Sequence, residues 1–388
     1  MKRKLTIIGG LMPGPTGVGR VMMQLASEVQ GLNDQSVKLL YRGQGRPIRA
    51  LFLQRQTISA LKAFMVSAWS EFRFRIGTAH LSEKDRVLLI HPQSLGYVWT
   101  IHFIRKSTKP VWLYLMDSSF FCVRSYNHIF PMGSACTLCV GGDLTHSQVN
   151  CCTTDFGNVT DALDFITSLR EFSTVGKVKF IAQNRLQADL AKKHFGKGAI
   201  VKVAGILAAD WQIEDGACHP PSFSEYDIVF HAPPLEAKGF SWALMLANKL
   251  PGRRFLFPFE KPDWVVESVP NCTFKNIRWE SGLREAVRGC PLVLVPSLWS
   301  APVEGALIKS IRLAQKTAVI KNETAYSSEV PSGVLLRLPF DVMRAAAVIE
   351  GYFARSQENP PLSGKKFYDD FMKSNTQLVK RLLRLTSD

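Results

Sequence analysis

The chain has 388 residues, of which 46% are hydrophobic and 21% charged, and its formal net charge is +16. This length favours two domains, and the composition excludes a disordered chain. The apolar run after the basic start ends at Ile8, short of a signal peptide, and no window reaches the ~18 apolar residues of a membrane span. We therefore expect a cytoplasmic protein with an anionic partner, although a solvated basic surface explains most of the charge.

Short apolar runs alternate with helical patterns through the first half of the chain. Helical patterns lie, for example, at residues 19–29 and 184–195. The expected strands are the runs at 4–10, 36–41, 86–91, 109–116, 177–182 and 199–205. Such alternation is typical of a parallel sheet wrapped by helices, so we predict an N-terminal Rossmann-like domain over residues 1–206.

The first strand leads into a glycine-rich turn, "GGLMPGPTGVGR", at residues 9–20. Gly17 and Gly19 would let the backbone approach a ligand, and a helix start there offers N–H groups to an anion. The spacing is not G-x-G-x-x-G, and the second strand ends without the acid that would hold a nicotinamide ribose. A dehydrogenase is therefore disfavoured, and a tight turn without a ligand remains the alternative.

Residues 46–77 mix leucine, phenylalanine, methionine and tryptophan with many basic residues and one acid. A basic amphipathic helix of this kind can rest on an anionic membrane surface. A helix that packs on the sheet and turns a solvated basic face outward is the alternative.

A long loop with cysteines and glycines follows Asp117 and extends to about Asn158. Cys136 and Cys139 form a C-x-x-C pair, which in the cytosol indicates metal or redox chemistry. With Cys122 and Cys151 they would make four ligands for a structural zinc ion. Buried or free thiols are the alternative.

The second half repeats the alternation after a polar segment, residues 207–225, that is typical of a linker. We predict a second doubly wound domain over residues 226–362 and a C-terminal helix over 363–388 that packs back on the first domain. The expected strands are the runs at 226–231, 253–259, 272–277, 291–297, 317–321 and 333–338.

Two strand-to-helix turns of the second domain carry unusual residues. Lys238 and Gly239 start a helix, where an ammonium and the helix dipole would both face a diphosphate, although a lone lysine is more often solvated. The other turn, residues 295–310, holds Trp299 and then Glu304, the only carboxylate between Glu285 and Glu323. The alternative role for Glu304 is an acid in the first turn of a helix, where it complements the dipole.

Together these motifs resemble the retaining glycosyltransferases of family four. The segment "VPSLWSAPVEGALIKSIRLAQKTAVI" resembles their donor-site segment, "KG" at residues 238–239 resembles their phosphate-binding lysine, and "GVGR" at 17–20 resembles their N-terminal glycine loop. The order and spacing agree over nearly the whole chain. The resemblance implies a GT-B fold, in which two Rossmann-like domains face a central cleft.

The sequence also departs from the family pattern. The E-x7-E pair is absent, because Ala301 stands near the first acid and Lys309 or Ser310 near the second. Pro233 stands where an arginine is expected, with His231 nearby. Met116 replaces the histidine that precedes Asp117 at the end of the fourth strand. These departures indicate a divergent branch or a member that has lost activity.

The resemblance implies that the chain transfers a sugar, with retention, from a nucleotide-diphosphate sugar to a glycan or lipid-linked acceptor. Lipopolysaccharide, O-antigen and capsule chains are the acceptor types that we expect. Catalysis would fall to Lys238, Glu304 and Asp117, the last on the acceptor side. The implied donor-binding residues are Gly17, Gly19, Arg20, His231, Gly239, Trp299 and Lys309.

No other cofactor is expected, because the chain has no D-x-D motif for a metal-bound diphosphate. The alternative is a catalytically inactive GT-B protein that binds glycan or assists a partner enzyme. A nucleic-acid partner is disfavoured because the chain lacks clustered aromatic and basic motifs. The expected location is the cytoplasm, with the inner face of the cell membrane as a second site.

Overall fold

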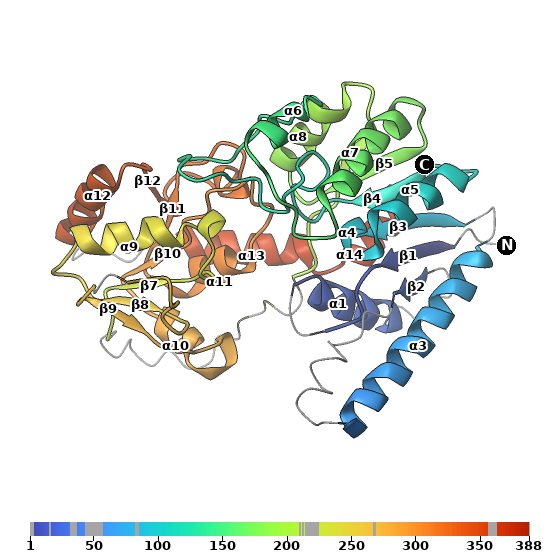
Figure 1. Cartoon of the computed structure of the whole chain (residues 1–388). Helices are drawn as coiled ribbons and strands as arrows, with labels where there is room; N and C mark the ends of the chain where they lie inside the picture. The colour runs from blue at the N-terminus through green and yellow to red at the C-terminus, as the bar shows by residue number, and fades with distance from the viewer. Residues whose placement is uncertain are drawn as a thin grey trace. The chain divides into compact units, whose positions relative to one another are not determined.

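The computed structural model describes residues 4–14, 17–31, 37–42, 57–81, 85–208, 211, 213, 225–266, 269–355 and 363–387. The chain divides into two compact units (Figure 1). Unit 1 comprises Met1–Ser125, Leu138–Leu207 and Gln377–Asp388. Unit 2 comprises Tyr126–Thr137 and Ala208–Thr376.

Unit 1 contains a six-stranded parallel sheet with the order β2-β1-β3-β4-β5-β6. Its strands, all expected from the sequence, are β1 (Leu5–Gly9), β2 (Val37–Tyr41), β3 (Arg86–Ile90), β4 (Val111–Tyr114), β5 (Val178–Ala182) and β6 (Val201–Val203). Its helices are α1 (Gly17–Gly31), α3 (Thr57–Ala79), α4 (Pro92–Leu95), α5 (Tyr97–Lys106), α6 (Thr145–Val149), α7 (Val159–Thr174), α8 (Arg185–Phe195) and α14 (Leu378–Leu385).

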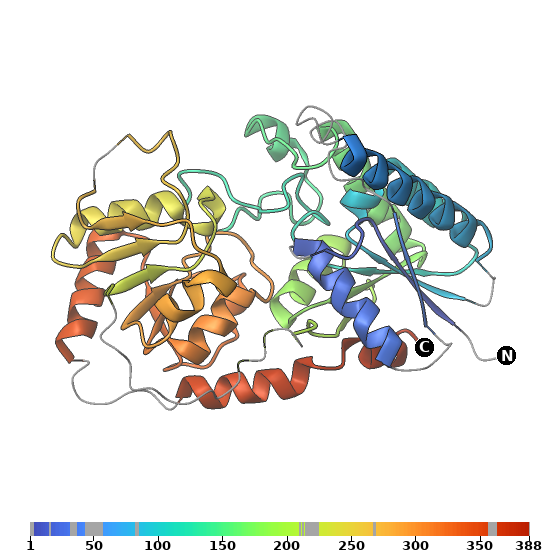
Figure 2. The same ribbon diagram turned by 90° about the horizontal axis from the view of Figure 1, so that it is seen from below.

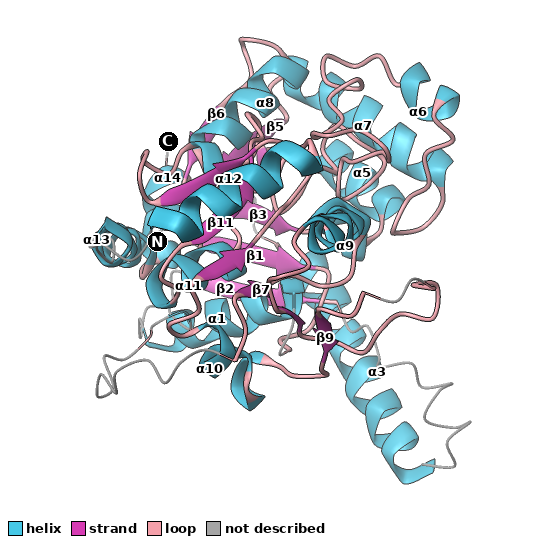
Figure 3. Cartoon of the chain, turned by 90° about the vertical axis from the view of Figure 1, so that its left-hand side faces the viewer, coloured by secondary structure: helices cyan, strands magenta, loops and turns pink. Residues whose placement is uncertain are grey.

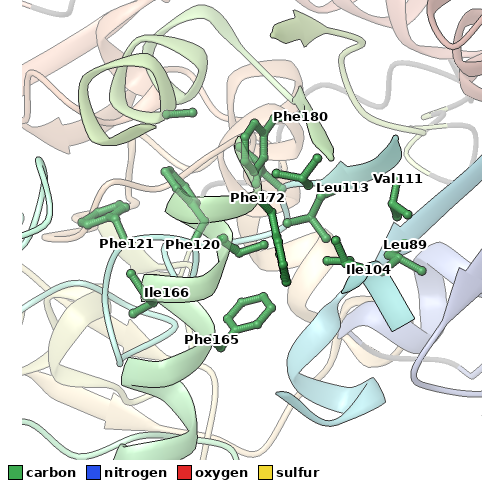
Figure 4. Packing of buried hydrophobic residues seen from close by; sticks show 14 of the residues in the cluster. Leu89, Ile104, Val111, Leu113, Phe120, Phe121, Phe165, Ile166, Phe172 and Phe180 are labelled. Atoms are coloured by element: carbon green, nitrogen blue, oxygen red, sulfur yellow. The ribbon is translucent and has the colours of Figure 1, made fainter. Parts of the chain in front are cut away.

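Both faces of this sheet are covered, because neighbouring residues of one strand enter different cores. Leu89 of β3 packs with Phe165 and Phe172 of α7 in the core shown in Figure 4. Its neighbour Leu88 packs with Met22 of α1 in the core of the opposite face. Strands that are buried on both sides carry continuous apolar runs rather than alternating ones. This is why the strands can be predicted from the sequence.

Unit 2 contains a second six-stranded parallel sheet with the order β12-β11-β10-β7-β8-β9. Its strands are β7 (Ile228–Phe230), β8 (Phe255–Phe257), β9 (Cys272–Phe274), β10 (Leu292–Leu294), β11 (Thr317–Ile320) and β12 (Leu335–Leu338). The chain winds outward from β7 to β9 and then returns to place β10 on the other side of β7. In such sheets ligands bind beyond the carboxyl ends of the strands at this point of reversal.

Helices cover both faces of the second sheet. The helical elements of unit 2 are η2 (Glu236–Lys238), α9 (Phe240–Lys249), η3 (Trp279–Ser281), α10 (Leu283–Val287), α11 (Gly305–Leu313), η4 (Tyr326–Ser328), α12 (Val342–Arg355) and α13 (Ser363–Asn375). Figures 1 and 2 show α9 and α12 side by side, and residues of both enter one core cluster. Residues of α10, α11 and α13 enter the other cluster. The predicted fold class, two doubly wound α/β domains, is thus present.

The units differ from the predicted domain ranges in two respects. Residues 126–137 belong to unit 2, although the chain before and after them belongs to unit 1. The segment 363–388 is two helices, of which α13 packs on α11 and α14 packs on α1. Leu378, Val379 and Leu382 bury the apolar side of α14 in unit 1. Most of the predicted linker, residues 207–225, lies outside the described residues.

Among the described residues, no helix is both long enough and apolar enough to cross a membrane.

Candidate functional site

Lys238 and Gly239 follow β7 at the point where the strand order of unit 2 reverses. Gly239 ends η2 and begins α9 with a φ of 75°, in the left-handed region that favours glycine. A Cβ atom at this position would lie 2.3 Å from the carbonyl oxygen of Pro296. Glycine is therefore required twice over, by its backbone conformation and by the close approach of the turn that follows β10.

Glu304 comes from that second turn and forms an ion pair with Lys238. It stands immediately before α11, but its side chain makes no capping bond to the helix. One carboxylate oxygen, Oε1, instead accepts from Lys238 Nζ and from the hydroxyl of Ser297, the latter at 3.0 Å. The Lys238 and Glu304 side chains are only 11% and 13% exposed. The acid is thus part of a nearly buried polar contact between two strand-to-helix turns.

Two aromatic rings lie beside the Lys238 ammonium. Its Nζ is 4.8 Å from the ring centre of Trp299 and 5.3 Å from that of Tyr126. Tyr126 meets Trp299 edge-on, with the ring centres 4.6 Å apart. The indole Nε1 of Trp299 is buried and has no hydrogen-bond partner among the described residues. A buried donor without a partner is costly, and an acceptor on a ligand would satisfy it.

The fully buried Asn127 attaches the segment 126–137 to this turn. Its amide nitrogen donates to Ser300 Oγ at 2.9 Å and to the carbonyl of Cys136 at 2.8 Å, and its oxygen accepts from Ser300 N at 2.9 Å. Asn322 donates to the carbonyl of Trp299 at 2.8 Å. The backbone at 299–300 is therefore held from two sides. The sequence analysis missed Tyr126 and Asn127, since nothing in one sequence links positions 173 residues apart.

His231 and Lys309 form a second group around the same helix, α11. His231 Nδ1 lies 2.8 Å from the hydroxyl of Ser310, and its ring stacks on Trp279 with centres 5.4 Å apart. Lys309 Nζ lies 4.4 Å from the ring centre of Trp279. Burial, assisted by the Lys309 charge, lowers the pKa of His231 to about 3, so the ring is neutral near pH 7.

Asp117 lies in unit 1, beyond the carboxyl end of β4, in a polar cluster with side chains that follow β3. Gln93 Nε2 donates to both carboxylate oxygens at 2.9 and 2.8 Å, and Ser119 N donates at 3.0 Å. His91 Nε2 is 3.9 Å from the carboxylate. Burial lowers the pKa of His91, and the charge of Asp117 opposes that shift. His91 also has a φ of 55°, an uncommon conformation for a residue other than glycine.

The glycine-rich turn of unit 1 is compact. Helix α1 begins at Gly17, whose φ is 52°, and Gly14 N donates to the carbonyl of Gly19 at 2.9 Å. A Cβ on Gly19 would lie 3.2 Å from the nitrogen of Gly14, which leaves little room for a side chain. Arg20 is half-buried in the first turn of the helix.

The structure thus distributes the predicted site residues over both units. Asp117, Gly17, Gly19 and Arg20 belong to unit 1. The remaining predicted residues belong to unit 2: His231, Lys238, Gly239, Trp299, Glu304 and Lys309. Direct contacts join Lys238, Glu304 and Trp299.

The cysteine loop does not form the expected metal site. Cys122, Cys136 and Cys139 are buried and Cys151 is exposed. Within the described ranges, no three His, Cys, Asp or Glu side chains are arranged as metal ligands. The structure therefore gives no support to the predicted zinc ion.

Comparison with solved structures identifies the fold. The chain is similar to sucrose-phosphate synthase from Thermosynechococcus elongatus, with a TM-score of 0.62, 11% identity and 99% of each chain covered. It is also similar to a UDP-forming α,α-trehalose-phosphate synthase from Burkholderia xenovorans, with a TM-score of 0.55, 11% identity, and 99% of this chain and 100% of that chain covered. Anabaena HepE, solved with UDP and glucose, gives a TM-score of 0.55 at 12% identity, with 99% of this chain and 98% of that chain covered.

No protein-family model matches the sequence, and no curated protein matches it either. The structural similarity shows that the chain has the GT-B fold, as predicted.

Proposed function

We propose that the chain is a glycosyltransferase that moves a sugar from a nucleotide-diphosphate sugar to a glycan or lipid-linked acceptor, with retention of configuration. The observation that carries this proposal is the convergence of Lys238, Glu304 and Trp299 where the strand order of unit 2 reverses. A cation, an acid and a buried indole donor at that place suit a diphosphate with sugar hydroxyls attached.

Each of these side chains has a role in the proposed reaction. The Lys238 ammonium neutralises the charge that develops on the leaving diphosphate, and it acts strongly because water is largely excluded around it. Glu304 holds Lys238 before the donor binds. Once phosphate takes over that ion pair, the carboxylate accepts hydrogen bonds from ribose or sugar hydroxyls, and Trp299 Nε1 gains an acceptor.

The other predicted residues complete the proposal. Gly17, Gly19 and Arg20 offer backbone N–H groups and a charge to the diphosphate, and Asp117 serves the acceptor. His231, Gly239 and Lys309 shape the donor site of unit 2. Because lysine and helix starts supply the positive charge, we propose that transfer needs no divalent metal. We place the protein in the cytoplasm at the inner membrane face, with an acceptor of the lipopolysaccharide, O-antigen or capsule type.

A catalytically silent GT-B protein that binds glycan or a partner is the second candidate. The specific observation in its favour is that Lys238 is nearly buried, with its charge already balanced by Glu304. In addition, the place of the family's second acid is taken by Lys309 and Ser310, and the Ser310 hydroxyl is bonded to His231.

A thermal-shift panel of UDP, GDP, ADP and CMP sugars, with UDP-glucose first, tests both candidates. A sugar nucleotide at about 100 times its dissociation constant stabilises by about 2.7 kcal/mol, a rise of roughly 5–10 °C in melting temperature. Lys238→Met should abolish the shift, whereas Lys249→Met, an exposed lysine of α9, should keep it. Release of nucleotide diphosphate is then measured with the stabilising donor.

The outcomes distinguish the active transferase from the catalytically silent protein. A shift with turnover supports the transferase, and the anomeric configuration of the product and the effect of EDTA then test retention and metal independence. A shift without hydrolysis or transfer favours the silent protein. No shift with any donor, or an equal shift in Lys238→Met, overturns the proposed donor site.

A further inference from the structure

Helix α3 is attached to unit 1 along one side only. Its buried residues are Ala60, Ser70, Phe74 and Gly77. Ser70 Oγ donates to the carbonyl of Tyr41 at the end of β2, and a Cβ on Gly77 would lie 2.8 Å from Leu40. Figure 1 shows the helix next to the edge strand β2, with which it is in contact, and Figure 3 shows its other end extending away from the sheet. One face of α3 therefore has a packing role that is already satisfied.

The opposite face is apolar as well, and it is exposed. Six large apolar side chains recur at intervals of three or four residues, the spacing of one side of a helix. Their exposed fractions are 72% for Ile58, 58% for Leu61, 63% for Met65, 62% for Trp69, 53% for Phe72 and 43% for Ile76. We call these six side chains the apolar stripe. Residues 46–56 of the basic stretch lie outside the described residues, and the alternative for this stretch, a helix that packs on the sheet and turns a basic face outward, is not excluded by the packing of α3 on β2.

Basic side chains border the apolar stripe. At 100° per residue, Lys62 and Arg73 fall along one border of the stripe and Arg75 along the other, and all three are exposed. The one acid of α3, Glu71, faces the side that packs on unit 1 and accepts from Arg42 at 3.2 Å and Arg75 at 3.0 Å. The outward side of α3 thus combines large apolar groups with positive charge and no carboxylate.

Positive charge continues past the carboxyl-terminal end of the helix. Arg75 lines a pocket together with Lys106 and Lys109, and Asp85 is the one acid among the described residues that line it. The basic character is therefore not confined to the helix, and it extends to α5 and to the start of β4.

We propose that α3 lies on the surface of an anionic lipid bilayer, with the apolar stripe inserted at the boundary of headgroups and acyl chains. Lys62 and Arg73 would then contact lipid phosphates, as basic side chains do in interfacial helices. A second copy of the chain is a less suitable partner. If the apolar stripes of two copies packed antiparallel, Lys62 and Arg73 of one copy would lie beside those of the other, and α3 has no carboxylate on that side to balance their charge. This inference rests on α3 and holds for a catalytically silent protein too.

Sedimentation with vesicles tests the proposal on the full chain. Vesicles of phosphatidylcholine with about one-third phosphatidylglycerol are compared with pure phosphatidylcholine. We expect binding at least about tenfold stronger to the anionic vesicles, weakened by ~1 M salt. Both Trp69→Ser/Phe72→Ser and Lys62→Glu/Arg73→Glu should lower it by about tenfold or more.

Matched controls use exposed side chains elsewhere in unit 1. Val98→Ser on α5, at 63% exposure, and Lys192→Glu/Lys193→Glu on α8 should change vesicle binding by less than about twofold. All variants alter exposed side chains, so an unchanged melting temperature confirms the fold. Absence of binding by the unaltered chain, or equal binding by the stripe variants, overturns the proposal. A dimer that Trp69→Ser/Phe72→Ser converts to monomer, without vesicle binding, would assign the stripe to a second copy.

Discussion

Replacing Glu304 by glutamine removes the charge that faces Lys238 and keeps an oxygen in the same place. Because the two side chains are only 13% and 11% exposed, the remaining ammonium would be left unpaired and largely desolvated. Removing one partner of a buried ion pair costs about 3–5 kcal/mol. The amide oxygen still accepts one hydrogen bond, and the two aromatic rings beside Nζ remain. We therefore expect the free energy of unfolding to fall by about 2 kcal/mol.

The assay is thermal unfolding of the full chain, with a separate transition sought for unit 2. Glu350→Gln is the matched control, because its pair with Arg253 is exposed and such pairs contribute about 0–1 kcal/mol. For the double variant Lys238→Met/Glu304→Gln we expect a smaller loss in the free energy of unfolding than the sum of the losses of the two single variants. The difference should be at least about 1 kcal/mol. Additive losses, or an unchanged melting temperature for Glu304→Gln, would refute the reading of this pair as a buried and coupled contact.

Three further substitutions test the surroundings of the pair. Gly239→Ala should destabilise unit 2 by about 2 kcal/mol or more in thermal unfolding, since its φ is 75° and a Cβ would meet the Pro296 carbonyl at 2.3 Å; an unchanged melting temperature would contradict this. Asn127→Ala should lower the free energy of unfolding by about 2–3 kcal/mol, because it leaves the backbone N–H of the buried Ser300 without its acceptor; an unchanged melting temperature would argue against this role. The pKa of His231 falls from 6.5 to about 3 on folding, so its contribution to stability is complete above pH 6.5 and falls by about 2 kcal/mol near pH 5; His231→Asn should flatten that part of the pH profile of melting temperature, and an equally steep profile would argue against a buried neutral ring.

The strands could be predicted because both faces of each sheet are covered. In β4 the residues Val111–Tyr114 are all buried, so the strand is one apolar run bounded by polar residues. The turns that carry Lys238 and Glu304 could be predicted for a related reason. The carboxyl ends of parallel strands lie at one edge of the sheet. Once the strands are predicted, the turns that follow them are therefore expected to lie close together, even though no local pattern links residues so far apart in the chain.

The outer face of α3 could not be predicted in the same way. Phe72 and Phe74 are equally apolar, yet Phe72 is 53% exposed and Phe74 is buried. When a helix is apolar on two sides, its sequence pattern does not indicate which side packs on the sheet. The position of Lys309 over Trp279 was also unforeseen, because it depends on how η3 packs beside α11, and that packing has no local signature.

The short segment 126–137 has a consequence for how the chain must fold during synthesis. Asn127 leaves the ribosome long before Ser300, and at ~5–20 residues per second the 173 residues between them take about 10–35 s. Until then Tyr126 has no Trp299 to meet. The first unit, in turn, lacks α14 until residues 378–385 are made.

Neither unit is therefore a continuous piece of the chain. A fragment that begins at residue 208 would keep the sheet of unit 2 but would lose Tyr126 and Asn127, and a fragment that ends at residue 207 would lose α14. A cut between residues 207 and 208 therefore separates each unit from a segment that belongs to it. A nascent chain stalled before residue 300 would accordingly hold the segment 126–137 without the residues that it packs on in unit 2.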